Sequence, residues 1–311
     1  MELKPFEKLN NPENKELHIA PKTVDFNVIG TCNLNCEWCW GPDHKLEATL
    51  SANDWIEIGK QLKKLGTENI VITGGEPLLR KDMLEILEGL KSIGMRVTLS
   101  TNTINLLQEN NLKSLKFIDE IGIPLDGSTM EVNNIMRKGN IKAFDSSIQA
   151  IKYVQEKYPA IKITLRTVLS QKNLTDTKNI PQTLNANGID LTKFRWKLYQ
   201  ITPTGPRKEQ TTLGENNWLI SEEETQKVVS ELKNIYPQMT ISVLLSKEHN
   251  ARYLHIDPIG KITTLTGKNP QHEELGNVFN DKKIIQLKNI LIDLDNSEKR
   301  VTDTLHGTDN F

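Results

Sequence analysis

Short apolar runs alternate with longer amphipathic segments over most of this chain. The apolar runs between residues 24 and 198 are typical of buried strands, and the segments between them show the helical period with one apolar face. We predict strands at 24–29, 69–73, 96–100, 120–124, 162–168 and 194–198, and helices at 51–65, 82–93, 143–158 and 175–186.

Capping residues mark several helix boundaries. Ser51 and Asp82 stand where N-caps belong, and Gly66 and Gly94 follow the last periodic residues as C-terminal glycines do. Six strands that alternate with helices predict βαβ units with right-handed crossovers and a parallel sheet. The predicted fold class is therefore α/β.

The pattern changes after Tyr199. A polar loop precedes a capping box at 221–224, which predicts a helix to about residue 235. Strands are predicted at 240–245, 253–256 and 261–265, and a hairpin turn at 258–260 joins the last two. A final helix at 282–292 leads into a polar tail from residue 296 that we expect to fray. We divide the chain into an N-terminal segment 1–20, an α/β unit 21–200 and a C-terminal extension 201–311.

Composition narrows the class of protein. The 311 residues carry 39 basic and 40 acidic side chains, and this balance argues against nucleic acid and membrane surfaces as partners. No apolar run reaches the roughly 18 residues of a membrane span, and the first residues lack the apolar core of a signal peptide. We expect a soluble cytoplasmic protein. We expect no leader-binding domain, because only about 20 residues precede the first strand.

All three cysteines, Cys32, Cys36 and Cys39, lie within eight residues. An odd, clustered set is not a disulfide framework and indicates a metal site, an iron–sulfur cluster or redox chemistry. Three thiolates hold three irons of a [4Fe–4S] cluster and leave the fourth iron open to a small molecule with an amine and a carboxylate. The alternative is a structural zinc site, in which four protein ligands surround the ion, and His44 is the candidate for the fourth ligand.

The C-x3-C-x2-C spacing, with Trp38 before the third cysteine, resembles the signature of the radical S-adenosylmethionine (radical SAM) superfamily. Gly74, Gly75, Glu76 and Pro77 follow the second strand as the family's GGEP motif does. In the family this motif binds the amino group of the methionine moiety, and Glu76 can accept a hydrogen bond from such an ammonium group. The resemblance covers about residues 20–200.

Weaker motifs follow in register with the family. Ser100 and Asn102, at the end of the third strand, correspond to polar contacts with the cofactor ribose. Arg166, on the fifth strand, and Asn173, after it, correspond to positions where relatives form the edge of the site that faces the adenine and the substrate. A polar turn that caps a strand is the plainer interpretation of residues 100–102, and structural roles are the plainer interpretation of the other two.

Asp126 and Arg137 also match the family, although the segment around Asp126 departs from the family pattern. Asp126 lies in a segment in which Pro124 replaces the usual serine, so a hydroxyl expected near the cofactor carboxylate is missing. Arg137 matches an arginine that relatives use against that carboxylate. The alternatives are turn chemistry for Asp126 and an exposed side chain for Arg137.

The resemblance implies a partial (β/α)6 barrel with the cluster at the C-terminal end of the strands, where strand-to-helix loops carry function. It implies two cofactors, a [4Fe–4S] cluster and S-adenosyl-L-methionine. An external electron donor of the flavodoxin or ferredoxin type would reduce the cluster. The bound cofactor would then be cleaved to methionine and a 5′-deoxyadenosyl radical, which takes a hydrogen atom from the substrate.

The second half of the chain restricts the chemistry. Residues 194–200 resemble the last barrel strand of viperin-like radical SAM proteins, and residues 253–261 and 275–278 resemble a SPASM-type or twitch-type extension. Relatives of that type bind auxiliary clusters there, but no cysteine follows Cys39 in this chain, so we expect no auxiliary cluster. Candidates for substrate contact are weak, and core or solvated positions are the plainer interpretation for Trp196, Lys197, Tyr199, Arg207 and His255.

Three functions remain open from the sequence. The leading hypothesis is a single-cluster radical SAM enzyme that acts on a small molecule, with a nucleotide or nucleoside as the favoured class. The second is a radical SAM maturase that epimerises or crosslinks a ribosomally made peptide. The third is a cluster- or zinc-binding regulator without catalysis, against which the GGEP motif argues.

Overall fold

The structure, a computed structural model, describes residues 20–207, 217–249, 254–266, 271–280 and 283–284. Its strands are β1 (Thr23–Asn27), β2 (Asn69–Thr73), β3 (Arg96–Ser100), β4 (Glu120–Pro124), β5 (Lys162–Leu169), β6 (Phe194–Gln200), β7 (Thr240–Leu244), β8 (Leu254–Ile256), β9 (Lys261–Thr266), β10 (Gln271–Asn277), β11 (Phe279–Asn280) and β12 (Lys283–Ile284). Its α-helices are α2 (Ala52–Lys64), α3 (Met83–Ser92), α4 (Glu109–Leu112), α5 (Met130–Met136), α6 (Ala143–Lys157), α7 (Ile180–Ala186) and α9 (Glu222–Ile235). Short 3-10 helices are η1 (Pro77–Leu79), η2 (Lys113–Phe117), η3 (Thr177–Asn179) and η5 (Ser246–His249).

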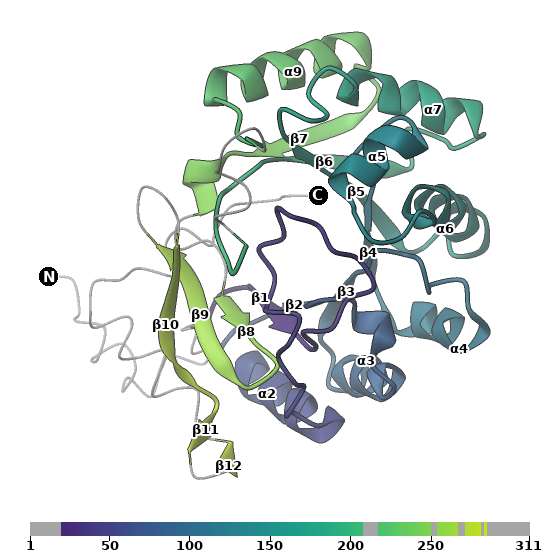
Figure 1. Ribbon diagram of the computed structural model, residues 1–311. Helices are drawn as coiled ribbons and strands as arrows, with labels where there is room; N and C mark the ends of the chain where they lie inside the picture. Colours follow the sequence, from purple (N-terminus) through teal and green to yellow (C-terminus); the bar gives the residue numbers. More distant parts are fainter. Residues whose placement is uncertain (1–19, 208–216, 250–253, 267–270, 281–282, 285–311) are drawn as a thin grey trace, which may run out of the picture.

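A curved sheet of ten strands organises the molecule, and the helices lie along its outer side (Figure 1). Strands β1 to β6 are neighbours in sequence order and pair in parallel, which confirms the α/β prediction and gives the architecture of a partial barrel. The predicted bounds of these strands differ from the observed ones by two residues at most.

The sheet also continues into the region after residue 200. Strand β7 pairs in parallel with β6, and β8 pairs in parallel with β1 on the other edge. The predicted hairpin is confirmed as the antiparallel pair β8–β9, to which β10 adds a strand that the sequence did not predict. The boundary at residue 200 therefore stays a prediction, because the strands on either side of it share one sheet.

The two faces of the sheet differ in chemistry. In β6, Phe194, Trp196 and Leu198 are buried, while Lys197 and Tyr199 on the opposite face are only half-buried. The buried face meets the helices, as in the contact of Trp55 from α2 with Phe26 of β1, whose ring centroids are 4.8 Å apart. The other face lines the inner side of the curve and carries polar side chains on most strands: Asp25, Asn27, Asn69, Thr98, Ser100, Glu120, Thr164, Arg166, Arg195, Lys197 and His255.

Most predicted helices are confirmed, with three corrections before residue 200. Ser51 forms a capping box with Asp54, whereas Asp82 occupies the N-cap position of α3 without a capping hydrogen bond, because its carboxylate binds Arg80. The helix predicted at 175–186 is divided into η3 and α7, and Pro181 lies at the start of α7. The sequence missed α4 and α5, which are too short for a periodic signal.

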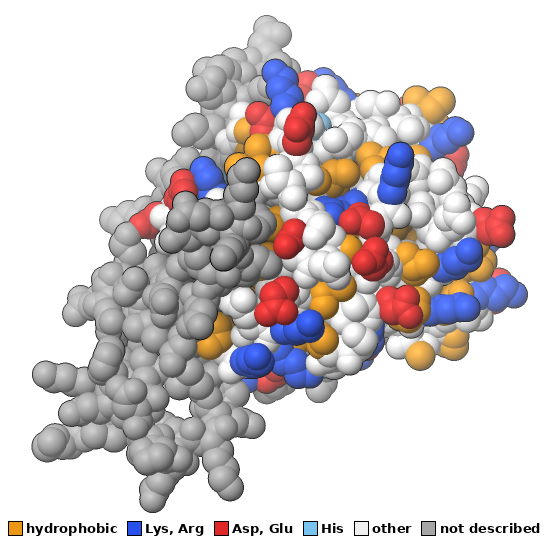
Figure 2. Space-filling model, turned by 90° about the horizontal axis from the view of Figure 1, so that it is seen from below, with side chains coloured by type: hydrophobic (Ala, Val, Ile, Leu, Met, Phe, Trp, Pro, Cys, Tyr) orange, Lys and Arg blue, Asp and Glu red, His pale blue; other side chains and the backbone are white. Residues whose placement is uncertain are grey.

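The last predicted helix, at 282–292, is wrong at residues 283–284, which form strand β12. Residues 282 and 285–292, and the tail from 296, lie outside the described residues. Within the described ranges, no helix is long and apolar enough to cross a membrane. Figure 2 shows acidic and basic side chains intermixed on the visible face of the described part, in keeping with the balanced charge.

Candidate functional site

The cysteines lie on a long loop between β1 and α2, and one arginine closes the base of that loop. Arg80 donates hydrogen bonds to the carbonyl oxygens of Val28, 2.8 Å away, and Leu50, 2.6 Å away. Its side chain is 8% exposed and pairs with Asp82 at 2.6 Å. A buried guanidinium with charge-assisted hydrogen bonds is a strong tie, so Arg80 holds both ends of the cysteine loop. No local sequence pattern indicates this role of Arg80.

The three cysteines are free thiols, of which Cys36 is buried and the other two are half-buried. Burial raises the pKa of Cys32 to about 11 and the pKa of Cys36 to about 12. Such thiols stay protonated at neutral pH and are poor nucleophiles, because the thiolate is the reactive form. A bound metal ion is what deprotonates buried thiols of this kind.

The surroundings of the sulfurs fit an iron–sulfur cluster. The Cys32 sulfur accepts hydrogen bonds from the backbone N–H of Leu34 at 3.4 Å and from the side-chain amide of Asn102 at 3.8 Å. Hydrogen bonds of this kind to ligand sulfurs support clusters and tune their potential. The cysteine spacing and these donors therefore suit a cluster held by three thiolates.

The zinc alternative fits poorly. Arg207 Nη2 lies 2.9 Å from Nδ1 of His44, and a guanidinium only donates, so Nδ1 is the acceptor and the proton is on Nε2. Burial and the Arg207 charge lower the pKa of His44 and so favour its neutral form. His44 is thus engaged by an arginine, which disfavours it as a fourth ligand.

The GGEP segment packs directly against the start of the cysteine loop. The backbone N–H of Gly75 donates to Ile29 O at 2.6 Å, and that of Glu76 donates to Thr31 O at 2.9 Å. A Cβ atom on Gly75 would overlap the carbonyl oxygens of Gly30 and Thr31, and Gly74 has a φ of +134°. Both glycines are required by this close approach of two backbones. Pro77 is buried and begins η1.

Glu76 is fully buried and bound by groups of the protein itself. Its carboxylate accepts hydrogen bonds from Thr101 Oγ1 at 2.7 Å, from the N–H of Asn102 at 2.6 Å and from the N–H of Leu78 at 3.0 Å. Burial raises its pKa, and these hydrogen bonds oppose that shift. Glu76 therefore ties the end of β2 to the end of β3. Its predicted contact with an ammonium group stays a prediction.

The turn after β3 connects the hydrogen bonds of Glu76 to the cysteine loop. Asn102 donates from its side chain to Asn33 Oδ1 at 2.6 Å as well as to the Cys32 sulfur. Thr103 has a φ of +69°, a conformation that costs free energy for a β-branched residue, and its N–H is held by Thr101 Oγ1 at 3.0 Å. Thr101 belongs to the polar segment 100–102 that the sequence indicated, but its hydrogen bond to Glu76 was not predicted.

Asp126 and Arg137 form a buried ion pair. Asp126 is fully buried, the Arg137 side chain is 13% exposed, and Oδ2 and Nε are 2.6 Å apart. The Nε–H does not point along that line, so charge rather than an aligned hydrogen bond holds the pair. The alternative that Arg137 is exposed is wrong. Asp126 also accepts from the N–H of Val168 at 2.7 Å, and Asn173 donates to Asp126 O at 2.8 Å, so both have structural contacts.

Ser100 and Arg166 meet on the inner face of the sheet. Nη1 of Arg166 donates to Ser100 Oγ at 2.8 Å across the intervening strand β4. Gly122 of β4 makes room, since a Cβ there would overlap the guanidinium. The Nε of Arg166 is buried without a hydrogen-bond partner in the described part of the chain. A lone glycine inside a strand signals such a close approach, and this signal identifies Gly122.

Three rings from distant segments gather beside the third cysteine. Trp40 follows Cys39 and lies 5.1 Å from His255 of β8 and 6.5 Å from His272 of β10, between ring centroids. The two imidazoles are 5.9 Å apart, and His255 Nδ1 is 3.4 Å from Asp25 Oδ2. His255 is 1% exposed, so the ring is buried, and its structural role stays a prediction. These contacts attach the β8–β10 hairpin region to the cysteine loop.

We predict that His272 stays neutral down to about pH 4. Burial of the ring and the nearby His255 lower the pKa of His272 to about 4, although part of the residue is exposed at the sheet edge. Because the folded pKa is below the ordinary value, the contribution of His272 to stability is complete above pH 6.5 and is lost as the pH falls toward 4. An NMR titration, with His272→Gln to assign the signal, measures this pKa. A titration at the ordinary value would contradict the stacked arrangement.

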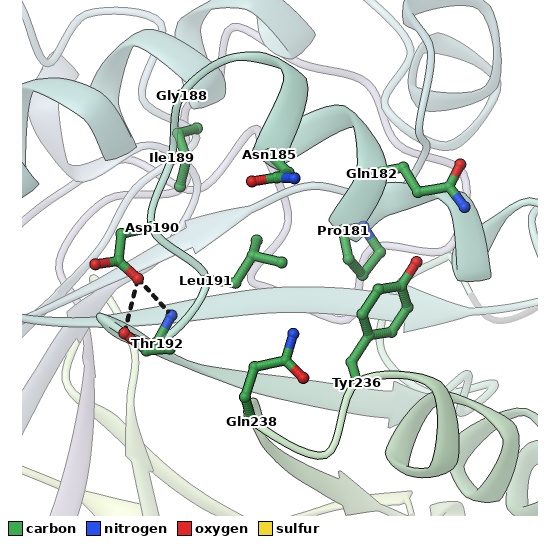
Figure 3. Close-up of a pocket in the computed structure, with 10 residues that line it drawn as sticks. All are labelled: Pro181, Gln182, Asn185, Gly188, Ile189, Asp190, Leu191, Thr192, Tyr236 and Gln238. Atoms are coloured by element: carbon green, nitrogen blue, oxygen red, sulfur yellow. Dashed lines mark hydrogen bonds between the residues drawn. The ribbon is translucent and has the colours of Figure 1, made fainter.

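A groove of about 510 Å³ lies elsewhere, between α7 and the turn after α9 (Figure 3). It is lined by Pro181, Leu191, Thr192, Tyr236 and Gln238, and the last four precede β6 or β7. The groove is therefore at the N-terminal ends of the strands. Ser100, the GGEP segment and the cysteine loop are at the C-terminal ends, so the groove is separate from the candidate site.

One family model and several curated proteins match this sequence. The family model described as "Radical SAM superfamily" matches residues 26–180, which contain the cysteine loop and the GGEP segment. A probable GTP 3′,8-cyclase of Archaeoglobus fulgidus is 46% identical over 57 residues, 18% of this chain and 19% of that protein. The corresponding protein of Methanococcus aeolicus is 38% identical over 72 residues, 22% of this chain and 24% of that protein. The matches thus span less than a quarter of these relatives.

Solved structures share the fold at low sequence identity. Streptococcus suis SuiB bound to precursor peptide SuiA has a TM-score of 0.64 at 17% identity, covering 78% of this chain and 59% of that chain. Native anSMEcpe with bound AdoMet and Kp18Cys peptide has a TM-score of 0.65 at 14% identity, covering 89% of this chain and 82% of that chain. These similarities show the fold alone.

Proposed function

Because the chain belongs to the radical SAM superfamily, we propose that Cys32, Cys36 and Cys39 hold a single [4Fe–4S] cluster that acts with S-adenosylmethionine on a small anionic molecule. The observation that carries this proposal is the backbone pairing of the cysteine loop with the GGEP segment. When bound, the cluster and S-adenosylmethionine supply the one-electron cleavage that generates a hydrogen-abstracting radical. An external electron donor of the flavodoxin or ferredoxin type and a cytoplasmic location belong to the same proposal.

The chain's own residues divide into two groups around this chemistry. Ser100 and Arg166 present a hydroxyl and a guanidinium on the inner face, and we assign them direct contact with S-adenosylmethionine. Asn102 donates to the Cys32 sulfur and keeps that loop in position. Of the other predicted cofactor residues, the contacts described above support positioning roles: Gly74, Gly75, Glu76, Pro77, Asp126 and Arg137.

The inner face next to Arg166 favours an anionic substrate. Lys197 of β6 lies directly beside Arg166 in the strand register, and Arg195 lies beside Thr164 one step below. Arg195 is 3.5 Å from Glu120, which offsets its charge. Like charges side by side on neighbouring strands repel, and a bound phosphate or carboxylate between them removes that repulsion. This arrangement supports a phosphorylated small molecule, with a nucleotide as the favoured class.

The test is anaerobic production of 5′-deoxyadenosine. The loaded protein is mixed with S-adenosylmethionine and dithionite, with and without a nucleotide mixture. We expect strong stimulation by one nucleotide. Lys197→Gln should raise the concentration for half-maximal stimulation about tenfold, the loss expected for one charge-assisted hydrogen bond. Lys193→Gln is the matched control, because Lys193 is exposed and pairs only weakly, at 3.7 Å, with Asp190.

The outcomes separate the hypotheses. Slow cleavage that no nucleotide stimulates would support the family chemistry and point to a peptide or another small molecule as substrate. Equal responses of the Lys197 and Lys193 variants would contradict the contact of Lys197 with an anionic substrate. Absence of deoxyadenosine from a properly loaded cluster would contradict the proposed enzyme and leave a metal-binding regulator.

A further inference from the structure

The segment after α5 lies against the cysteine loop along its length. Trp38 donates from its ring Nε1 to Met136 O at 2.7 Å, and the N–H of Asn35 donates to Lys138 O at 2.5 Å. The side chain of Lys138 pairs with Glu37. Residues 136 and 138 are therefore both fixed to the loop, and the residue between them, Arg137, has a defined position behind it.

Arg137 places a permanent positive charge against the part of the loop that carries Cys36 and Cys39. Its guanidinium carbon is 5.3 Å from the centroid of the Trp38 ring, which lies between Cys36 and Cys39 in the sequence. Because the side chain is 13% exposed, water screens this charge little.

A second guanidinium lies against the same loop. Arg207 donates from Nη1 to the carbonyl oxygen of Cys36 at 2.7 Å and from Nη2 to His44 at 2.9 Å. Its segment approaches closely, since Gly205 has a φ of +77° and a Cβ there would overlap the backbone of Trp40. Arg137 and Arg207 thus come from two separate segments and both contact the short stretch of chain around Cys36.

We propose that Arg137, assisted by Arg207, raises the reduction potential of the cluster and so makes its one-electron reduction by the external donor easier. This inference rests on the proposed function. Reduction adds one negative charge to the cluster, and a fixed positive charge in a poorly screened environment favours the reduced form. Asp126 keeps Arg137 in position and offsets part of its charge, so Arg137 is a positioning and tuning residue that acts through the cysteine loop.

This role differs from the carboxylate contact that the resemblance suggests for Arg137. A contact with S-adenosylmethionine would show in the affinity for that cofactor. The charge of Arg137 would change the reduction potential of the cluster even before S-adenosylmethionine binds. The potential of the loaded protein without S-adenosylmethionine therefore separates the two roles.

The test is an EPR-monitored redox titration of the reconstituted protein without S-adenosylmethionine. The double variant Arg137→Met/Asp126→Asn removes both charges and avoids an unpaired buried carboxylate. At a fixed potential we expect the ratio of oxidised to reduced cluster to rise about tenfold, which is 59 mV for a one-electron couple. Arg137→Lys should stay within about twofold of wild type, because it keeps the charge. Arg207→Gln, which leaves the buried pair intact, should shift the ratio about threefold in the same direction.

Lys91→Met/Asp119→Asn is the matched control. It removes another ion pair, 2.8 Å long, between α3 and the residue before β4, at the N-terminal end of the sheet. If Arg137→Met/Asp126→Asn and Arg207→Gln both keep the wild-type potential, the inference is overturned. If the double variant then shows only a raised dissociation constant for S-adenosylmethionine, Arg137 is assigned to the cofactor. If the double variant does not load a cluster, the Arg207→Gln titration decides. A wild-type protein that binds no cluster would overturn the proposed function itself.

Discussion

Cys36→Ala is expected to abolish cluster binding and turnover together. Cys36 is the most buried of the three thiols, and its carbonyl oxygen is held by Arg207, so the alanine variant keeps the loop contacts and loses the sulfur alone. The wild-type cluster has one iron without a protein ligand. With only two thiolates left, a second iron would also lack a protein ligand, and the cluster would not be held. Visible absorbance, iron and sulfide content and 5′-deoxyadenosine production should all fall to background.

His44→Gln is the matched control for this prediction. In a cluster site His44 is not a ligand, so its variant should load iron and sulfide as the wild type does. In a zinc site the same variant would lose its metal, because His44 is the candidate fourth ligand. Turnover that survives Cys36→Ala would reject the proposed radical chemistry.

Gly75→Ala is expected to disrupt the whole candidate site by adding a single methyl group. That group would overlap two backbone carbonyl oxygens of the cysteine loop, so the loop and the GGEP segment must separate. Separation breaks the hydrogen bonds from Gly75 and Glu76 to Ile29 and Thr31. Overpacking and lost hydrogen bonds together should lower the free energy of unfolding by about 3 kcal/mol. Chemical denaturation measures the loss, and cluster loading should fall with it.

Gly89→Ala makes the same chemical change where it can be accommodated. Gly89 is on α3, and the three atoms nearest to its added Cβ all belong to the side chain of Ile56, which can change its rotamer. Alanine also improves helix propensity, so the change in the free energy of unfolding should stay within about 1 kcal/mol. If Gly75→Ala retained wild-type stability and changed only the affinity for S-adenosylmethionine, the backbone-packing role of Gly75 would be wrong.

Local patterns in the sequence were sufficient for much of the fold. The strand and helix pattern from residue 24 to 200 depends on side-chain periodicity, and the capping box at Ser51 depends on residues three apart. The elements that the sequence missed have weak local signals. Helix α5 has seven residues, and the polar strand β10 acquires its structure by pairing with β9.

The candidate site was only partly predictable. The cysteine spacing and the GGEP motif are contiguous in sequence, so their chemistry is visible there. The partners of Glu76 are not, because Thr101 and Asn102 reach it only when β2 and β3 align. The same holds for Arg166, whose contact with Ser100 requires the glycine of the strand between them.

The sequence by itself determined the six strands between residues 24 and 200, the helices α2, α3 and α6, the three thiols on one loop and the glycines that follow the second strand. These features depend on residues close together in the chain. Only the tertiary structure decided that Arg80 closes the cysteine loop, that Asp126 pairs with Arg137, and that Trp40 meets the histidines of β8 and β10. Long-range pairing was decisive here, because burial strengthens a charge or ring contact only after the sheet brings the distant segments together.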